Sequence, residues 1–202
     1  MNRIRLKGVI QNIQESHIIN DIQFSKAHML VSRTDGKEDM LNIRFKKYAN
    51  PYLENQEVSL SGNVRSYSCK EKSGKNKVEL YVFTYFDIPE LDDDDTECIN
   101  NVELDGRICK IEPLRHTNNG KKNIHLIIAN NLIVSEGSKK LNSYIPCIAW
   151  GELAERLSEL TVNTSIEITG KLHSREYKKR LPDNNIELRV AHEVEIIGFE
   201  IL

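Results

Sequence analysis

Aromatic side chains stand near basic ones at several points of the sequence, a pairing suited to binding an unpaired strand of nucleic acid. Such binding combines cations that neutralise phosphates with aromatic faces that stack on bases, at about 1–3 kcal/mol per base. The candidate aromatics of the second half are Trp150, Tyr144, which lies six residues earlier on the same face of a regular strand, and Tyr177. The alternative for all three is partial burial in the core, because tyrosine and tryptophan are amphipathic.

Basic residues lie close to these aromatics. In the first half, Phe45 is flanked by basic residues and Tyr67 follows later, although Phe45 is equally suited to a core position. A basic loop can also be an ordinary solvated loop. With Trp150, Tyr144 and Tyr177, the candidate nucleic-acid-binding residues are Phe45, Tyr67, Arg44, Lys46, Lys47, Arg115, His116, Lys121, Lys122, Arg175, Lys178 and Lys179.

Motifs for catalysis or metal binding are missing from the sequence. It contains no phosphate-binding loop, dinucleotide fingerprint, zinc-protease helix or nucleophile elbow. The four cysteines are scattered and form no C-x-x-C pair. The adjacent aspartates 92–95 lack the alternating geometry of a metal loop. We therefore expect a protein that is not an enzyme and needs no metal or cofactor, with a nuclease as a distant alternative.

The strands that must position the candidate residues form an internal sequence repeat, with one copy in each half of the chain. Alternating apolar and polar residues predict half-buried strands, and a glycine inside a strand marks a sharp bend. Gly8 and Gly106 occupy matching places in the first strands, as do Gly62 and Gly170 in the fourth. The matched segments are 2–13 with 100–111, 58–66 with 166–174, and 78–83 with 186–190.

The second half shows the order of elements most clearly. Residues 123–129 and 144–150 have strand patterns, and residues 151–160 place their apolar side chains on one helical face. Three strands, a helix and two strands is the order of the OB-fold, a Greek-key barrel that binds oligonucleotides. Pro51 makes a long helix unfavourable at the matching connector of the first half. The predicted fold is all-β: two tandem five-stranded OB-fold barrels, each with a short helix or connector between strands 3 and 4.

Charge divides the chain in the middle. Residues 1–90 carry 14 basic and 11 acidic residues, residues 91–98 carry five acids, and residues 99–202 carry 14 of each. Because adjacent carboxylates repel one another, we expect 91–98 to be an exposed linker between domains 1–90 and 99–202. No apolar run is long enough for a membrane span and no secretory signal opens the sequence, so a cytoplasmic location is expected.

Four segments of the second half, at 101–107, 114–120, 144–155 and 166–177, carry motifs in a characteristic order. By these motifs the second half resembles the bacterial single-stranded DNA-binding protein family. The resemblance implies stacking positions at Trp150 and Tyr177. Family members with one barrel assemble as tetramers, so two barrels per chain imply a homodimer with four OB-folds. Members usually end in an acidic tail that recruits other proteins, whereas this chain ends in the apolar alternation 196–202.

These patterns predict non-enzymatic binding of single-stranded DNA with low sequence specificity, in DNA replication, recombination or repair. RNA stays open as a ligand, and replication or recombination proteins as partners. The alternative is a primosome-like or adaptor OB-fold module that acts mainly through protein–protein contacts. The net charge of -2 and the missing acidic tail favour that alternative.

Overall fold

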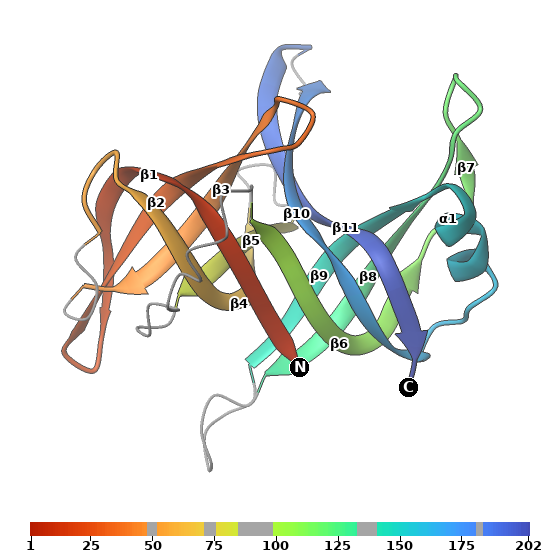
Figure 1. Cartoon of the computed structure of the whole chain (residues 1–202), viewed down its shortest axis with the longest axis horizontal. Coiled ribbons are helices and arrows are strands. Elements are labelled where there is room, and N and C mark those ends of the chain that lie inside the picture. The colour runs from red at the N-terminus through yellow and green to blue at the C-terminus, as the bar shows by residue number, and fades with distance from the viewer. Residues whose placement is uncertain (48–51, 71–75, 85–98, 133–140, 181–183) are drawn as a thin grey trace.

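The structure is a computed structural model that describes residues 1–47, 52–70, 76–84, 99–132, 141–180 and 184–202. The described residues are nearly all β, as expected, with a sheet of 11 strands and one short helix. Figure 1 shows the first half on the left, the second half on the right, and both termini at the bottom. The expected linker 91–98 lies outside the described residues.

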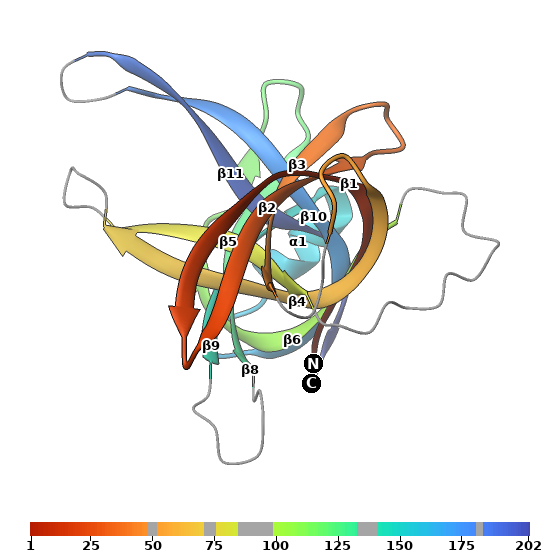
Figure 2. The ribbon, with the colours of Figure 1, turned by 90° about the vertical axis from the view of Figure 1, so that its left-hand side faces the viewer.

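Five strands of the first half pair in a closed circuit. β1 pairs with β2, β2 with β3, β3 with β5, β5 with β4, and β4 again with β1. All of these pairs are antiparallel except β3–β5, which is parallel. Figure 2 shows these strands curling round one centre. Their bounds are β1 Asn2–Ile19, β2 Ile22–Ser32, β3 Glu38–Lys46, β4 Glu57–Lys70 and β5 Asn76–Thr84.

The second half repeats this circuit. β6 pairs with β8, β8 with β9, β9 with β11 in parallel, β11 with β10, and β10 again with β6. The short strand β7 adds to one end of β8. The bounds are β6 Asn100–Ile111, β7 Arg115–His116, β8 Lys122–Leu132, β9 Leu141–Trp150, α1 Gly151–Ser158, β10 Ser165–Arg180 and β11 Ile186–Ile201.

The core follows from the alternation in the strands. In β1, Ile4, Leu6 and Ile10 point inward and are at most 1% exposed. Gly8 lies between them, where a Cβ atom would come within 2.1 Å of the Leu30 carbonyl oxygen. The matching glycine of β6, Gly106, has the same role, since a Cβ there would lie 2.6 Å from the Ala129 carbonyl oxygen. These glycines let two strands cross closely while both bend.

The predicted helix is present as α1. Its buried residues are Ala154 and Leu157, which join the core, while Leu153 and Leu160 pack against it at its margin. The helix begins directly after Trp150, at Gly151, whose φ of +60° is rarely adopted by other residues. The position of Trp150 is therefore fixed between the end of a strand and the start of a helix.

The parallel pairs give the residue equivalence between the two halves. Ile43 pairs with Val82 in β3–β5, and Cys147 pairs with Val194 in β9–β11. Position 43 therefore corresponds to 147, and 82 to 194. In β4 and β10, Val64 pairs with Val82 and Leu172 with Val194, so 64 corresponds to 172. Gly62 thus matches Gly170, as the sequence repeat predicted.

A continuous sheet joins the two halves. β1 and β6 are equivalent strands, and they pair with each other in antiparallel fashion at Ile4 and Val102. Asn2, which is 7% exposed, donates from Nδ2 to the carbonyl oxygen of Val64 and to Oδ1 of Asn130, both at 2.8 Å. The halves are therefore linked by backbone pairing and by a buried amide.

Two equivalent junctions add to this link. At one, Ser66 of β4 meets β9: the backbone N–H of Tyr144 donates to Ser66 Oγ at 2.7 Å. At the other, Ser174 of β10 meets β3: the backbone N–H of Met40 donates to Ser174 Oγ at 2.9 Å. Positions 66 and 174 correspond, as do 144 and 40, so the two contacts are related by the repeat.

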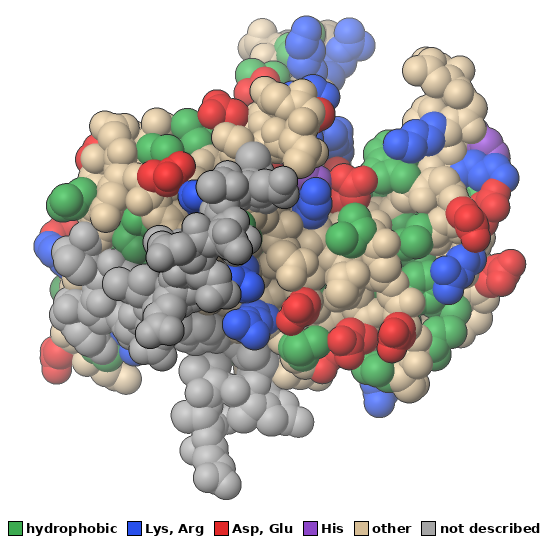
Figure 3. All heavy atoms as spheres, in the orientation of Figure 1, with side chains coloured by type: hydrophobic (Ala, Val, Ile, Leu, Met, Phe, Trp, Pro, Cys, Tyr) green, Lys and Arg blue, Asp and Glu red, His purple; other side chains and the backbone are tan. Residues whose placement is uncertain are grey.

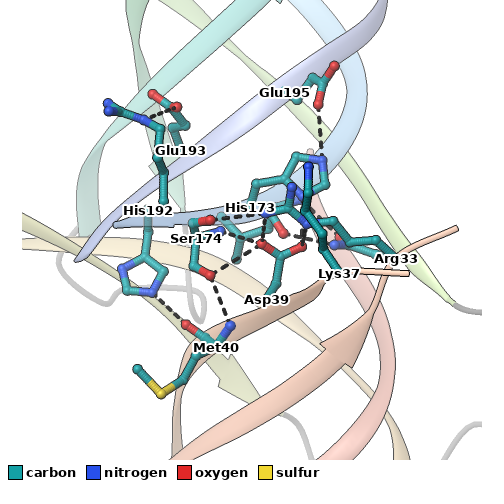
Figure 4. Close-up of polar contacts among 12 residues, drawn as sticks. Arg33, Lys37, Asp39, Met40, His173, Ser174, His192, Glu193 and Glu195 are labelled. Atoms are coloured by element: carbon teal, nitrogen blue, oxygen red, sulfur yellow. Dashed lines mark hydrogen bonds and ion pairs between the residues drawn. The ribbon is translucent and has the colours of Figure 1, made fainter. Parts of the chain in front are cut away.

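The second junction holds a buried carboxylate, Asp39, which is 0% exposed (Figure 4). It accepts hydrogen bonds from Arg33 Nε at 2.7 Å, from His173 Nδ1 at 2.8 Å and from the backbone N–H of Ser174 at 2.6 Å. Burial alone raises the pKa of Asp39, but the bonds from His173, Arg33 and Ser174 outweigh it and bring the pKa to about 2. Asp39 therefore stays ionised and ties β3 to β10.

Candidate nucleic-acid interface

The outer face of β2, β3, β5 and β4 carries aromatic rings interleaved with cations. Strand alternation places Leu41, Ile43 and Phe45 of β3 in the core. The residues between them point outward, as do alternate residues of the neighbouring strands. The resulting first-half face consists of Phe24, Lys26, His28, Asn42, Arg44, Lys46, Arg65, Tyr67, Glu79, Tyr81 and Phe83.

Arg44 lies against two tyrosines at the centre of the first-half face. Its guanidinium carbon is 4.4 Å from the ring centre of Tyr67 and 4.3 Å from that of Tyr81. The Tyr67 hydroxyl donates to Glu79, which fixes the orientation of that ring. A guanidinium over an aromatic face is attracted by the ring quadrupole. Arg44 thus presents a positive charge between two flat rings.

A second aromatic cluster lies beside the first. The Phe24 ring stacks on the His17 ring with centres 4.9 Å apart, and its centre is 6.2 Å from that of Phe83. The guanidinium carbon of Arg65 lies 4.0 Å from the ring centre of Phe83. The first-half face therefore offers several rings and cations within one surface.

A hollow of about 340 Å³ opens on the first-half face. Its lining includes Lys26, His28, Asn42, Arg44 and Tyr81. The Nδ1 atom of His28 is buried and has no hydrogen-bond partner among the described residues. The hollow therefore combines positive charge, ring surface and a free polar ring atom.

The corresponding face of the second half has fewer rings. Trp150 is half-buried at the end of β9, and Lys121 Nζ lies 4.8 Å from its ring centre. Tyr177 is also half-buried, with the Arg175 guanidinium carbon 5.9 Å from its ring centre. Tyr144 is 48% exposed and lies near the junction with β4. The three predicted aromatics are accessible but spread along the half.

Carboxylates replace rings at two equivalent positions. The pairing of β11 with β9 and β10 makes Glu193 correspond to Tyr81 and Glu195 to Phe83. Arg175 Nε lies 3.4 Å from Glu193 Oε1, and His125 Nδ1 lies 3.8 Å from Glu193 Oε2. Part of the positive charge of this face is therefore neutralised within the protein.

The other predicted cations fall into two groups. Three form ion pairs: Arg115 with Glu112 at 2.8 Å, Lys122 with Glu155, and Lys47 with Glu15. His116 and Lys178 are exposed, whereas Lys46 and Lys179 are partly buried. Lys and Arg side chains gather at the projecting end of the β10–β11 hairpin, at the top of Figure 3.

Phe45 is a core residue, so the stacking role considered for it is wrong. Its side chain is 3% exposed, and its ring packs edge-on against Tyr52 with centres 5.0 Å apart. The pairing makes Phe45 correspond to Ala149, and it is the next residue, Lys46, that takes the position of Trp150. A slip of one residue moves a strand side chain to the opposite face.

Several residues of the first-half face were not predicted: Phe24, Lys26, His28, Asn42, Arg65, Glu79, Tyr81 and Phe83. The alternating run 78–83 contained the signal for part of this set, because Leu80 and Val82 fill the core and leave Tyr81 and Phe83 outside. Within the described ranges, no helix has the length and apolarity to cross a membrane. The same ranges contain no group of three or more side chains arranged to hold a metal ion.

Comparison with known proteins adds to this geometry. Two solved structures of the single-stranded DNA-binding protein from Thermus aquaticus share the fold. The wild-type protein has a TM-score of 0.72 and 19% identity, and the comparison covers 100% of this chain and 93% of that one. A deletion mutant of the same protein has a TM-score of 0.71 and 20% identity, covering 100% of this chain and 94% of that one. No curated protein matches the sequence.

The model of the single-strand binding protein family matches residues 99–197. This match spans just under half of the chain, so it is the second half that is similar to the single-strand binding protein family.

Proposed function

We propose that this chain is a non-enzymatic cytoplasmic protein that binds single-stranded DNA with low sequence specificity, in DNA replication, recombination or repair. The observation that carries the proposal is the first-half face, where Arg44 lies against Tyr67 and Tyr81 and Arg65 against Phe83. The match of residues 99–197 to the single-strand binding protein family supports it further. The Thermus aquaticus protein that shares the fold is, by its name, a single-stranded DNA-binding protein.

The architecture that goes with this function is two tandem OB-fold barrels, at 1–90 and 99–202, joined by the acidic linker 91–98. The closed circuits of pairing, β1–β2–β3–β5–β4 and β6–β8–β9–β11–β10, support two barrels. The parallel pair in each circuit is what brings the last strand back beside the third. Helix α1 occupies the place between the third and fourth long strands of the second half.

Binding rests on two physical effects. Rings such as Tyr81 stack on bases, and because every base has a flat face, stacking gives little sequence preference. Cations such as Arg44 neutralise phosphates, which makes the affinity depend on salt. The first half contributes the larger share, because the carboxylates of Glu193 and Glu195 repel phosphates where the first half has rings. In the second half, the contacts are Trp150, Tyr144, Tyr177, Arg115, His116, Lys121, Lys122, Arg175, Lys178 and Lys179.

Fluorescence anisotropy with labelled oligo-dT tests the proposal. The wild type should bind more weakly as salt is raised, and it should bind a duplex of equal length far less well. Tyr81→Ala should weaken binding by about 1–3 kcal/mol, the contribution of one stacked base. Tyr81→Phe keeps the ring and should bind like the wild type. Trp150→Ala should lower the affinity for the oligonucleotide less than Tyr81→Ala does.

Two outcomes would contradict the proposal. One is the absence of measurable binding to any single strand at low salt, and the other is equal affinity for duplex and single strand. A matched RNA oligomer in the same assay decides between DNA and RNA. If the chain instead forms a salt-insensitive complex with a replication protein and binds DNA weakly, it is the adaptor module.

The assembly that fits two barrels per chain is a homodimer with four OB-folds. Light scattering at micromolar concentration should give twice the mass of the 23.3 kDa chain. A monomeric mass would remove the dimer from the proposal but leave the binding face of each chain intact.

A further inference from the structure

Arg65 is a buried cation with an incomplete set of partners. The residue is 9% exposed, and its Nε and Nη2 atoms are buried without a hydrogen-bond partner among the described residues. The ring of Phe83 lies 4.0 Å from its guanidinium carbon and covers one face of the group. Burying a charge without a partner is costly, so an orphaned guanidinium points to an absent anion.

The repeat shows what is absent. Arg65 of β4 corresponds to His173 of β10, because Val64 corresponds to Leu172. At the second junction His173 Nδ1 lies 2.8 Å from the carboxylate of Asp39. The residue that corresponds to Asp39 at the first junction is Ser143, since Cys147 corresponds to Ile43. At these matched positions the first junction thus has an arginine in place of the histidine and a serine in place of the carboxylate.

The backbone around the first junction is otherwise arranged like the second. The N–H of Ser66 points to Ser143 Oγ at 3.4 Å, just as the N–H of Ser174 donates to Asp39 Oδ1 at 2.6 Å. The longer distance fits a short hydroxyl in a place where the repeat has a carboxylate. Ser143 is 3% exposed, so both it and Arg65 are buried.

We propose that Arg65 and Ser143 form an oxyanion site at the junction of β4 and β9, which binds a phosphate group. A guanidinium with its Nε and Nη2 atoms free can donate two parallel hydrogen bonds to two phosphate oxygens. The Ser143 hydroxyl, whose oxygen accepts from the Ser66 N–H, adds an uncharged donor. The phosphate can come from a bound strand, since Arg65 and the Phe83 ring beside it belong to the first-half face, or from free phosphate.

Ser143→Asp tests the site by supplying the absent carboxylate. It should raise the melting temperature of the protein in phosphate-free buffer, because Arg65 gains the partner that Asp39 gives at the other junction. Ser143→Asn has nearly the same shape without the charge and should not raise it. A melting temperature for Ser143→Asp at or below that of Ser143→Asn would overturn the proposal.

Inorganic phosphate is the direct probe. At constant ionic strength, replacing chloride with phosphate should raise the melting temperature of the wild type more than that of Ser143→Asp. The comparison between variants is needed because phosphate also stabilises proteins by exclusion from their surface. Arg65→Met should fold, since it removes an unpaired buried charge, and should respond to phosphate as Ser143→Asp does. Equal responses in all three proteins would overturn the site.

Oligonucleotide binding separates the two sources of phosphate. If the strand supplies the group, Arg65→Met should lower the slope of log affinity against log salt by about one phosphate contact. If free phosphate occupies the site, the slope stays unchanged while the phosphate effect on melting remains. A chain that binds no oligonucleotide but shows the phosphate effect would refute the proposed function and leave the oxyanion site standing.

Discussion

Replacing Asp39 with asparagine is the sharpest test of how the two halves are held together. Asparagine has almost the same shape, but it carries no charge to face Arg33 and His173. Removing one partner of a buried ion pair costs about 3–5 kcal/mol, since the other charge stays buried. The Arg33 side chain retains 25% exposure and can recover part of its hydration. We therefore expect Asp39→Asn to lower the free energy of unfolding by about 3 kcal/mol.

Urea unfolding at pH 7, followed by the fluorescence of Trp150, measures this loss. The matched control is Asp35→Asn, because Asp35 also pairs with a cation, Lys37 at 3.2 Å, but its side chain is 51% exposed. An exposed pair contributes about 0–1 kcal/mol, so the control should change stability little. A loss below about 1 kcal/mol for Asp39→Asn, or an equal loss in both variants, would refute the argument.

The pH dependence of the wild type gives a second measurement of the same carboxylate. The pKa of Asp39 is lowered from 3.8 to about 2 in the folded protein. A lowered pKa stabilises the fold above the unfolded value and loses that stabilisation as the pH falls through the folded value. The difference corresponds to about 2 kcal/mol. Between pH 4 and pH 2 the wild type should therefore lose about 2 kcal/mol more than Asp39→Asn, and parallel stability curves would contradict this.

Three further predictions follow from the packing, two for substitutions and one for thiol labelling. Gly8→Ala should lower the free energy of unfolding in urea by about 1–3 kcal/mol, because its Cβ would lie 2.1 Å from the Leu30 carbonyl oxygen. The control Ser32→Ala, on the exposed side of β2, should leave that free energy unchanged. Asn2→Ala should lower the free energy of unfolding by about 1–3 kcal/mol, because the Val64 N–H, which lies 2.9 Å from Asn2 Oδ1, loses its hydrogen-bond partner. An unchanged free energy of unfolding would mean that water replaces the amide. A variant with Cys69→Ser and Cys98→Ser keeps only Cys109 and Cys147. A thiol reagent should label exposed Cys109 in the native protein but should label Cys147 only after urea is added, because burial raises the pKa of the Cys147 thiol. Equal labelling rates would argue against the burial of Cys147.

The repeated pattern predicted the strands well because its signals are local. Alternation located most strands, and the matched glycines at 8, 106, 62 and 170 lie where strands cross closely. The helix after Trp150 was also visible from its apolar face. The segments 186–190 and 196–202 looked separate, whereas β11 runs from Ile186 to Ile201 as one strand. The polar residues between them follow the same sheet, where pairing with β10 outweighs their weaker pattern.

The binding face was predicted less completely, because its composition depends on register. Phe45 and Lys46 are neighbours, and only strand pairing decides which of them matches Trp150. Asp39 was also missed as a structural residue, because its partner His173 is 134 positions away in the sequence. Contacts of this kind follow from the way the two halves meet, which no local pattern records.

The pairing of β1 with β6 has a consequence for the integrity of the molecule. Strand hydrogen bonds, the Asn2 amide and the Asp39 cluster hold the halves together without help from the peptide chain that connects them. A protease cut between Thr84 and Ile99 should therefore leave a two-piece complex that elutes from a sizing column like the intact chain. The same logic makes this protein suitable for splitting: fragments ending and starting at that point should reassemble when they are expressed together.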